Sequence, residues 1–185
     1  MRLSAPVEYQ TISQALVKDA CPFCLYLKSF QSKILRELKA PDQITSICNF
    51  HAWAMAAASN KAAVSCVFRV LLEQHSIKEA RPCNVCAQVR AEENGRMKEF
   101  AGELSQPRIF EWVKAQGTFC IPHGTRLLGH IPRPIQLMVM DVLRRTATLL
   151  QEMLELVVSD SPEEKGTGGG ILGHAAEFLV SQRGL

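Results

Sequence analysis

Apolar residues recur along most of the chain at the three- and four-residue spacing that predicts amphipathic helices. Residues 22–39 form the first clear segment of this kind, and Pro41 ends it because the residue before a proline is disfavoured in a helix. The apolar positions on its helical period are Leu25, Leu27, Phe30, Ile34, Leu35 and Leu38. No stretch of useful length alternates between apolar and polar residues, as a half-buried strand would. The pattern therefore predicts an all-α fold.

The same reasoning predicts several further helices after and before this segment. They are expected over residues 12–18, 46–58, 61–77, 83–104, 107–116, 119–128 and 134–159. The last is the longest, and its apolar residues cover most of the circumference, so we expect neighbours on more than one side of it. Trp53 and Trp112 are expected to be anchors of the core.

The chain is expected to contain two helical units and a tail. Residues 1–80 form the first unit, and residues 81–160 form the second unit, which includes the long helix. Residues 161–170 have the composition of a flexible linker. Residues 171–183 then form a short amphipathic tail, which is too short to be stable alone and must dock on this chain or on a protein partner.

Four short motifs contain six of the seven cysteines and two of the five histidines. Each unit reads C-x-x-C, a spacer, and then C-x-x-H, with the spacer over residues 25–47 in the first and 87–119 in the second. The eight candidate ligands are Cys21, Cys24, Cys48, His51, Cys83, Cys86, Cys120 and His123. Two Cys3His sets are what two structural, tetrahedral zinc ions require. We therefore expect two metal-stapled units that share a core with the long helix.

The spacing leaves the pairing of the four motifs open. Each unit can bind its own ion, or the two C-x-x-C motifs can share one. Pairing within each unit is favoured here because each unit then folds independently. The repeated order of motifs, with an N-cap residue and an apolar residue before both Cys48 and Cys120, predicts an internal duplication.

Alternatives to structural zinc also use these cysteines. An iron–sulfur cluster is one, although the usual ferredoxin run of cysteines is absent from the sequence. A thiol-redox protein is another, but a redox C-x-x-C should follow a strand. A milder version is a zinc-based redox sensor, in which oxidation releases the metal. Complete Cys3His sets leave no open position for water, which argues against a zinc enzyme.

Composition and charge restrict the class of protein further. Apolar content is 47% and charged content 21%, which is typical of a globular chain. The net charge is +3 and basic residues are scattered, which argues against nucleic acid as a partner. No apolar signal segment follows the N-terminus and no long uncharged apolar run occurs, so we expect a cytoplasmic protein without a membrane span.

The motifs from Cys21 to His123, together with the tail Gly170 to Leu185, resemble a family of uncharacterised bacterial proteins. That family is all-helical, with two C-x-x-C…C-x-x-H units and a glycine-containing C-terminal tail. The resemblance implies metal binding. It implies no catalytic residue, because the family has no established activity.

Overall fold

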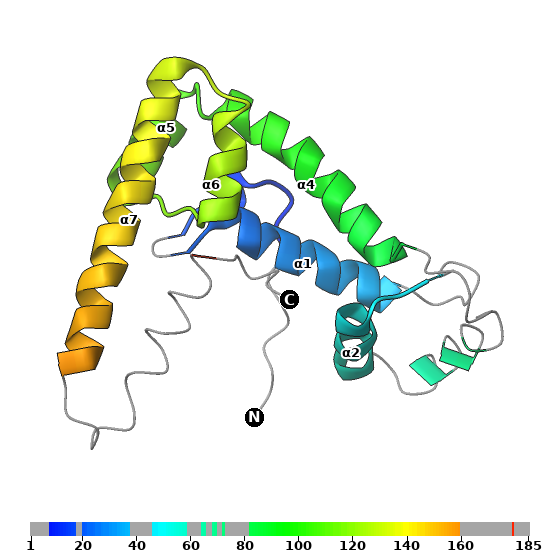
Figure 1. Cartoon of the computed structure of the whole chain (residues 1–185). Coiled ribbons are helices and arrows are strands. Elements are labelled where there is room, and N and C mark those ends of the chain that lie inside the picture. Colours follow the sequence, from blue (N-terminus) through cyan, green and yellow to red (C-terminus); the bar gives the residue numbers. More distant parts are fainter. Residues whose placement is uncertain are drawn as a thin grey trace. The chain divides into compact units, whose positions relative to one another are not determined.

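The computed structural model describes residues 8–17, 20–37, 46–58, 64–65, 68–69, 72, 82–159 and 179. These residues contain a short 3-10 helix, η1 (Ser13–Ala15), and six α-helices (Figure 1). The α-helices are α1 (Pro22–Glu37), α2 (Asn49–Ala58), α4 (Asn84–Glu103), α5 (Pro107–Gln116), α6 (Ile121–Leu128) and α7 (Arg133–Ser159). The described part of the chain has no strand, which confirms the predicted all-α fold.

The helices predicted over 22–39, 46–58, 83–104, 107–116, 119–128 and 134–159 agree with the structure to within a few residues, and the one predicted over 12–18 is only the short 3-10 helix η1. The long helix was expected over residues 134–159 and is α7. Of the helix expected over residues 61–77, the structure describes residues 64–65, 68–69 and 72, which are helical. The predicted linker and tail lie outside the described residues, apart from Leu179.

The chain forms two compact units that do not follow chain order. Unit 1 contains Met1–Tyr9, Leu27–Gly95 and Leu185, and unit 2 contains Gln10–Tyr26 and Arg96–Gly184. The first turn of α1 therefore belongs to unit 2 and the rest of the helix to unit 1. The predicted segments 1–80, 81–160 and 161–185 follow the sequence repeat instead, and that repeat boundary stays a prediction.

Unit 2 is built on the first half of α7, against which α5 and α6 pack (Figure 1). Gly124 on α6 allows this approach, because a Cβ atom there would lie 2.7 Å from Cδ2 of Leu143 on α7. An aromatic core lies within the same unit, with Phe23, Phe100 and Phe119 all fully buried. Burial of three phenylalanines contributes on the order of 5–9 kcal/mol of transfer free energy.

The end of α5 is held by both its own backbone and α7. The Gly117 N–H donates to the Val113 carbonyl at 2.9 Å. A side chain at Gly117 would not fit, since its Cβ would lie 2.6 Å from that same oxygen. The Arg145 guanidinium on α7 donates to the carbonyls of Lys114 at 2.8 Å and Gly117 at 3.3 Å. The Arg145 guanidinium donates to carbonyl groups that have no hydrogen-bond partner within α5, and its positive charge is stabilised by the negative end of the helix dipole.

Two expectations about the core were wrong. Among the described side chains of α7, over 133–155, the buried ones lie in its first half, at Ile135, Met138, Val139 and Val142. None of the described side chains over 143–155 is buried, and Leu149 is 51% exposed, so the second half is not covered on several sides. Trp53, expected to be a core anchor, is 72% exposed on α2, and Trp112 is half-buried.

Candidate metal centres

All four motifs have the same local geometry at the start of a helix. In each, the first cysteine precedes the helix and the second ligand follows three residues later, in the first turn. The carbonyl of the first cysteine accepts a hydrogen bond from the N–H four residues on, at 2.9–3.1 Å, at Cys21, Cys48, Cys83 and Cys120. Ligands three residues apart on a helix point to the same side.

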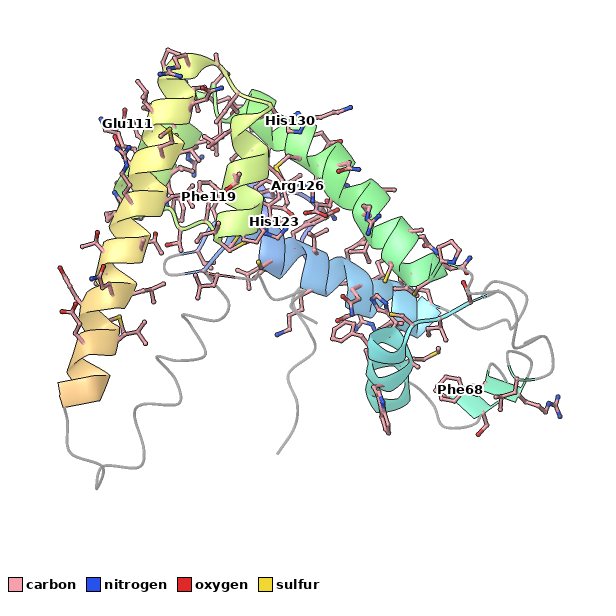
Figure 2. All side chains as sticks on the ribbon, in the orientation of Figure 1. Phe68, Glu111, Phe119, His123, Arg126 and His130 are labelled. Atoms are coloured by element: carbon pink, nitrogen blue, oxygen red, sulfur yellow. The ribbon has the colours of Figure 1, made fainter. Side chains whose placement is uncertain are left out.

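Unit 2 contains the first of two groups of ligand atoms. It joins Cys21 and Cys24, at the start of α1, to Cys120 and His123, at the start of α6 (Figure 2). The Sγ atoms of Cys24 and Cys120 are 3.7 Å apart. His123 Nδ1 lies 3.6 Å from Cys21 Sγ, 3.4 Å from Cys24 Sγ and 3.0 Å from Cys120 Sγ. All four residues are buried.

Unit 1 contains the second group. It joins Cys48 and His51, at the start of α2, to Cys83 and Cys86, at the start of α4. The Sγ atoms of Cys48 and Cys86 are 3.8 Å apart. His51 Nδ1 lies 3.2 Å from Cys48 Sγ, 3.5 Å from Cys83 Sγ and 3.4 Å from Cys86 Sγ. Cys48 and Cys86 are partly exposed, in contrast to the first group.

The structure brings together all eight predicted ligands, but it pairs them differently from the prediction. Pairing within each sequence unit was expected, and it was wrong. Each C-x-x-C motif joins the C-x-x-H motif of the other sequence unit. In unit 2 the aromatic core accounts for this choice, because Phe23 packs on Phe100 with ring centroids 5.4 Å apart and on Phe119 at 6.4 Å. Phe23 lies between Cys21 and Cys24, and Phe119 precedes Cys120.

In unit 1 the pairing is held by hydrogen bonds between the two loops. The N–H of Ser46 donates to Oδ1 of Asn84 at 3.1 Å, and the Asn84 N–H donates to the Ser46 carbonyl at 3.2 Å. The Ser46 hydroxyl donates to the Pro82 carbonyl. Ser46 thereby connects the segment before α2 to Cys83 and its neighbours.

The distances in both groups fit a single tetrahedral ion. With zinc–sulfur bonds of about 2.3 Å and zinc–nitrogen bonds of about 2.0–2.1 Å, a regular tetrahedron has edges of about 3.8 Å between sulfurs and about 3.6 Å between sulfur and nitrogen. The observed sulfur pairs, at 3.7 and 3.8 Å, match the first value. The sulfur–nitrogen distances, from 3.0 to 3.6 Å, are at or somewhat below the second. In both groups Nδ1 is the nitrogen that faces the sulfurs, so ligation there leaves the proton on Nε2.

The thiols of Cys83 and Cys86 in unit 1 do not ionise independently. Burial, followed by the neighbouring thiols of Cys83 and Cys48, raises the pKa of Cys86 to about 12. Burial also opposes ionisation of Cys83, but hydrogen bonds from the backbones of Cys86 and Cys48 outweigh it and the pKa of Cys83 is lowered. A bound cation would offset the cost of ionising neighbouring buried thiols, because it stabilises several thiolates at once.

Residues around the unit 2 ligands were not identified from the sequence. The Phe23 ring stacks on the imidazole of His123, with centroids 5.4 Å apart and an interplanar angle of 27°. Phe119 lies next to the site at the start of α6 (Figure 2). The sequence signal that could have identified them is their position next to ligands, since Phe23 lies between Cys21 and Cys24 and Phe119 directly precedes Cys120. These rings exclude water from the site and orient its histidine.

None of the helices in the described parts of the chain has the length and apolar character that crossing a membrane requires. Comparison of the chain with protein-family models, with curated proteins and with solved structures found no match.

Proposed function

We propose that this chain is a non-enzymatic protein with two structural zinc ions, each held by three cysteines and one histidine. The observation that carries the proposal is the size of the two ligand groups. In each, all four ligand atoms lie within 4.8 Å of one another, which fits tetrahedral coordination of a single ion. An iron–sulfur cluster needs room for its own irons and sulfides between the cysteine sulfurs, and this spacing offers too little. Soft thiolates with imidazole suit zinc.

Metal analysis of the purified protein tests this proposal. We expect two zinc ions per chain and no iron, and a brown protein containing iron and sulfide would overturn it. Structural zinc sites in finger peptides contribute roughly 10–16 kcal/mol, against roughly 5–15 kcal/mol for the stability of a whole domain. Removal of zinc by a strong chelator should therefore abolish most of the helical circular dichroism.

The coordination argues against catalysis by the zinc ions, which supports the proposal of a non-enzymatic protein. Four protein ligands complete a zinc tetrahedron, and catalytic zinc instead keeps one position for water or substrate. The chain then acts through the surfaces that its zinc-stapled helices present, as an interaction or scaffold subunit in the cytoplasm. Its place in the bacterial family named above is part of the same proposal.

A protein partner is supported by one exposed aromatic pair. Phe50 is 39% and Trp53 72% exposed, and they lie three residues apart on α2, so they share a side of that helix. Exposed tryptophan is enriched among residues that dominate binding energy. The tail over residues 171–183 is the second candidate contact. Deletion of residues 166–185 should leave two zinc ions bound, and unchanged partner binding would exclude the tail.

A zinc-based redox sensor is the second candidate function. The observation that favours it is the partial exposure of Cys48 and Cys86, because oxidants reach exposed thiolates first. A thioredoxin-like enzyme is less well supported, since no strand precedes either C-x-x-C motif in the described residues.

A further inference from the structure

The two ligand groups differ in their access to solvent, although their chemistry is the same. In unit 2, Cys21, Cys24, Cys120 and His123 are 8%, 6%, 2% and 1% exposed. In unit 1, His51 and Cys83 are 5% and 9% exposed, but the sulfur-bearing residues Cys48 and Cys86 are half-buried. All four residues of one group are therefore buried, and two cysteines of the other group are partly exposed.

The aromatic rings beside the two histidines also differ in their exposure to solvent. In unit 2 the ring that stacks on His123 belongs to Phe23, which is itself fully buried among other aromatic rings. In unit 1 the ring beside His51 belongs to Phe50, at 5.2 Å and nearly perpendicular. Phe50 is 39% exposed, so its ring shields His51 from solvent only in part.

We infer that the unit 1 group is a site of oxidative modification: hydrogen peroxide converts Cys48 and Cys86 to a disulfide and releases the zinc ion of unit 1, while the unit 2 ion stays bound. The inference rests on the proposed zinc-binding function. Exposure and thiolate character decide which cysteines are oxidised, and these two meet both conditions when they ligate zinc. Their sulfurs are adjacent, at 3.8 Å.

The chemistry uses one peroxide for each disulfide. One thiolate attacks a peroxide oxygen; the sulfur–oxygen bond forms, the oxygen–oxygen bond breaks, and hydroxide leaves. The second thiolate then attacks the sulfenic sulfur, the sulfur–sulfur bond forms, and the second hydroxide leaves. The two sulfurs lose two electrons in total, the peroxide gains them, and the two hydroxides take up two protons to become water. His51 and Cys83 alone hold the ion too weakly to retain it.

The structure also indicates why the disulfide joins Cys48 and Cys86, and not Cys83 and Cys86. Cys83 is the buried cysteine of this group. Its sulfur also accepts a hydrogen bond from the Cys86 N–H at 3.5 Å, which lowers its nucleophilicity. The loops that carry Cys48 and Cys86 are already held together by the hydrogen bonds between Ser46 and Asn84.

The test uses the full-length, zinc-loaded protein with Cys66→Ser, which removes the cysteine outside the two groups. Peroxide is added, zinc release is followed with a chromophoric chelator, and disulfides are mapped by mass spectrometry. We expect one equivalent of zinc to leave at least about tenfold faster than the second, because a buried group reacts only after local opening. We also expect the disulfide to join Cys48 and Cys86.

Two matched variants show which of the two zinc ions leaves in the fast phase. Cys48→His keeps a zinc ligand but removes one oxidisable sulfur, and it should abolish the fast release. Cys120→His makes the same change in the same motif position of unit 2 and should leave the fast release unchanged. If a variant does not fold, the disulfide map still decides.

The outcomes separate the two proposals. Fewer than two zinc ions in the untreated protein would overturn the proposed function. Two zinc ions that leave at equal rates, a unit 2 ion that leaves first, or a disulfide between other cysteines would overturn this inference and leave the zinc-binding proposal standing.

Discussion

The Sγ atoms of Cys24 and Cys120 lie 3.7 Å apart, although 96 positions separate these residues in the chain. Each belongs to a motif that repeats elsewhere in the sequence, and each could have paired with its nearer neighbour. The contact shows that the ligand groups close long loops. A metal ion that joins such distant residues lowers the conformational entropy of the unfolded chain, and the effect increases with the length of the closed loop. Loss of the ion should therefore affect unit 2 as a whole.

Substitution of the buried histidine tests that expectation. His123→Ala should reduce the zinc content from two ions to one and lower the melting temperature by about 10 °C or more, since about 1 kcal/mol corresponds to about 2–4 °C for a chain of this size. Zinc analysis and thermal circular dichroism give the two readouts. His130→Ala is the control, because His130 is exposed and outside both groups. Loss of both ions from His123→Ala would show that the sites depend on each other.

The aromatic core of unit 2 should contribute to both stability and metal binding. Phe100 is fully buried, with its ring edge-on to Phe23 and 6.3 Å from Phe119. Phe100→Ala should lower the free energy of unfolding by about 3–5 kcal/mol. Urea denaturation of the zinc-loaded protein measures this value. Leu149→Ala on exposed α7 surface is the control, with a change within about 0.5 kcal/mol. Equal effects of the two variants would contradict this account of the core.

Two helical glycines should respond to alanine in opposite directions. At Gly124 the new Cβ would lie 2.7 Å from a methyl carbon of Leu143, so Gly124→Ala should destabilise by about 1–3 kcal/mol through overpacking. At Gly95 in α4 nothing lies within 4 Å of the added atom. Gly95→Ala should stabilise by about 0.4–1 kcal/mol, because alanine loses less backbone entropy in a helix.

Chemical denaturation measures both glycine variants under the same conditions. Gly124→Ala combined with Leu143→Ala should be less destabilised than the sum of the two single variants, since removing the larger side chain opens the space that the new methyl needs. Additive effects, or a stabilised Gly124→Ala, would show that Leu143 moves away freely.

Zinc binding in unit 1 should weaken as the pH falls. A thiol at its ordinary pKa already holds a proton at neutral pH, and the pKa of Cys86, raised to about 12, extends this protonation through the alkaline range, so the ion must displace that proton. Each displaced proton changes the affinity by about tenfold per unit of pH, with weaker binding at lower pH. A competition titration against a zinc chelator measures this slope. The same titration of His51→Ala identifies which ion it belongs to, and a slope of zero would contradict the prediction.

Much of the local structure was predictable because it depends on nearby residues. The starts of α1 and α7 follow from apolar periodicity and from Pro22 and Pro134, which act within one turn of a helix. The orientation of each ligand pair follows likewise, since Cys120 and His123 must lie on one side of a helix start. The exposure of Trp53 was not predictable in this way, because an apolar residue on a short helix looks the same in sequence whether or not a neighbour covers it.

The sequence by itself determined which eight side chains come together, the helices that carry them, and the number of groups that they form. Backbone hydrogen bonds and side-chain spacing act over three or four residues, so a single chain displays them directly. Only the tertiary structure decided that Cys21 and Cys24 join Cys120 and His123, and that one group is closed while the other is partly open. The closed group depends on the packing of Phe23 against Phe100 and Phe119, and the partly open group depends on the hydrogen bonds between Ser46 and Asn84. Both are contacts between distant segments, and no local pattern contains their energy.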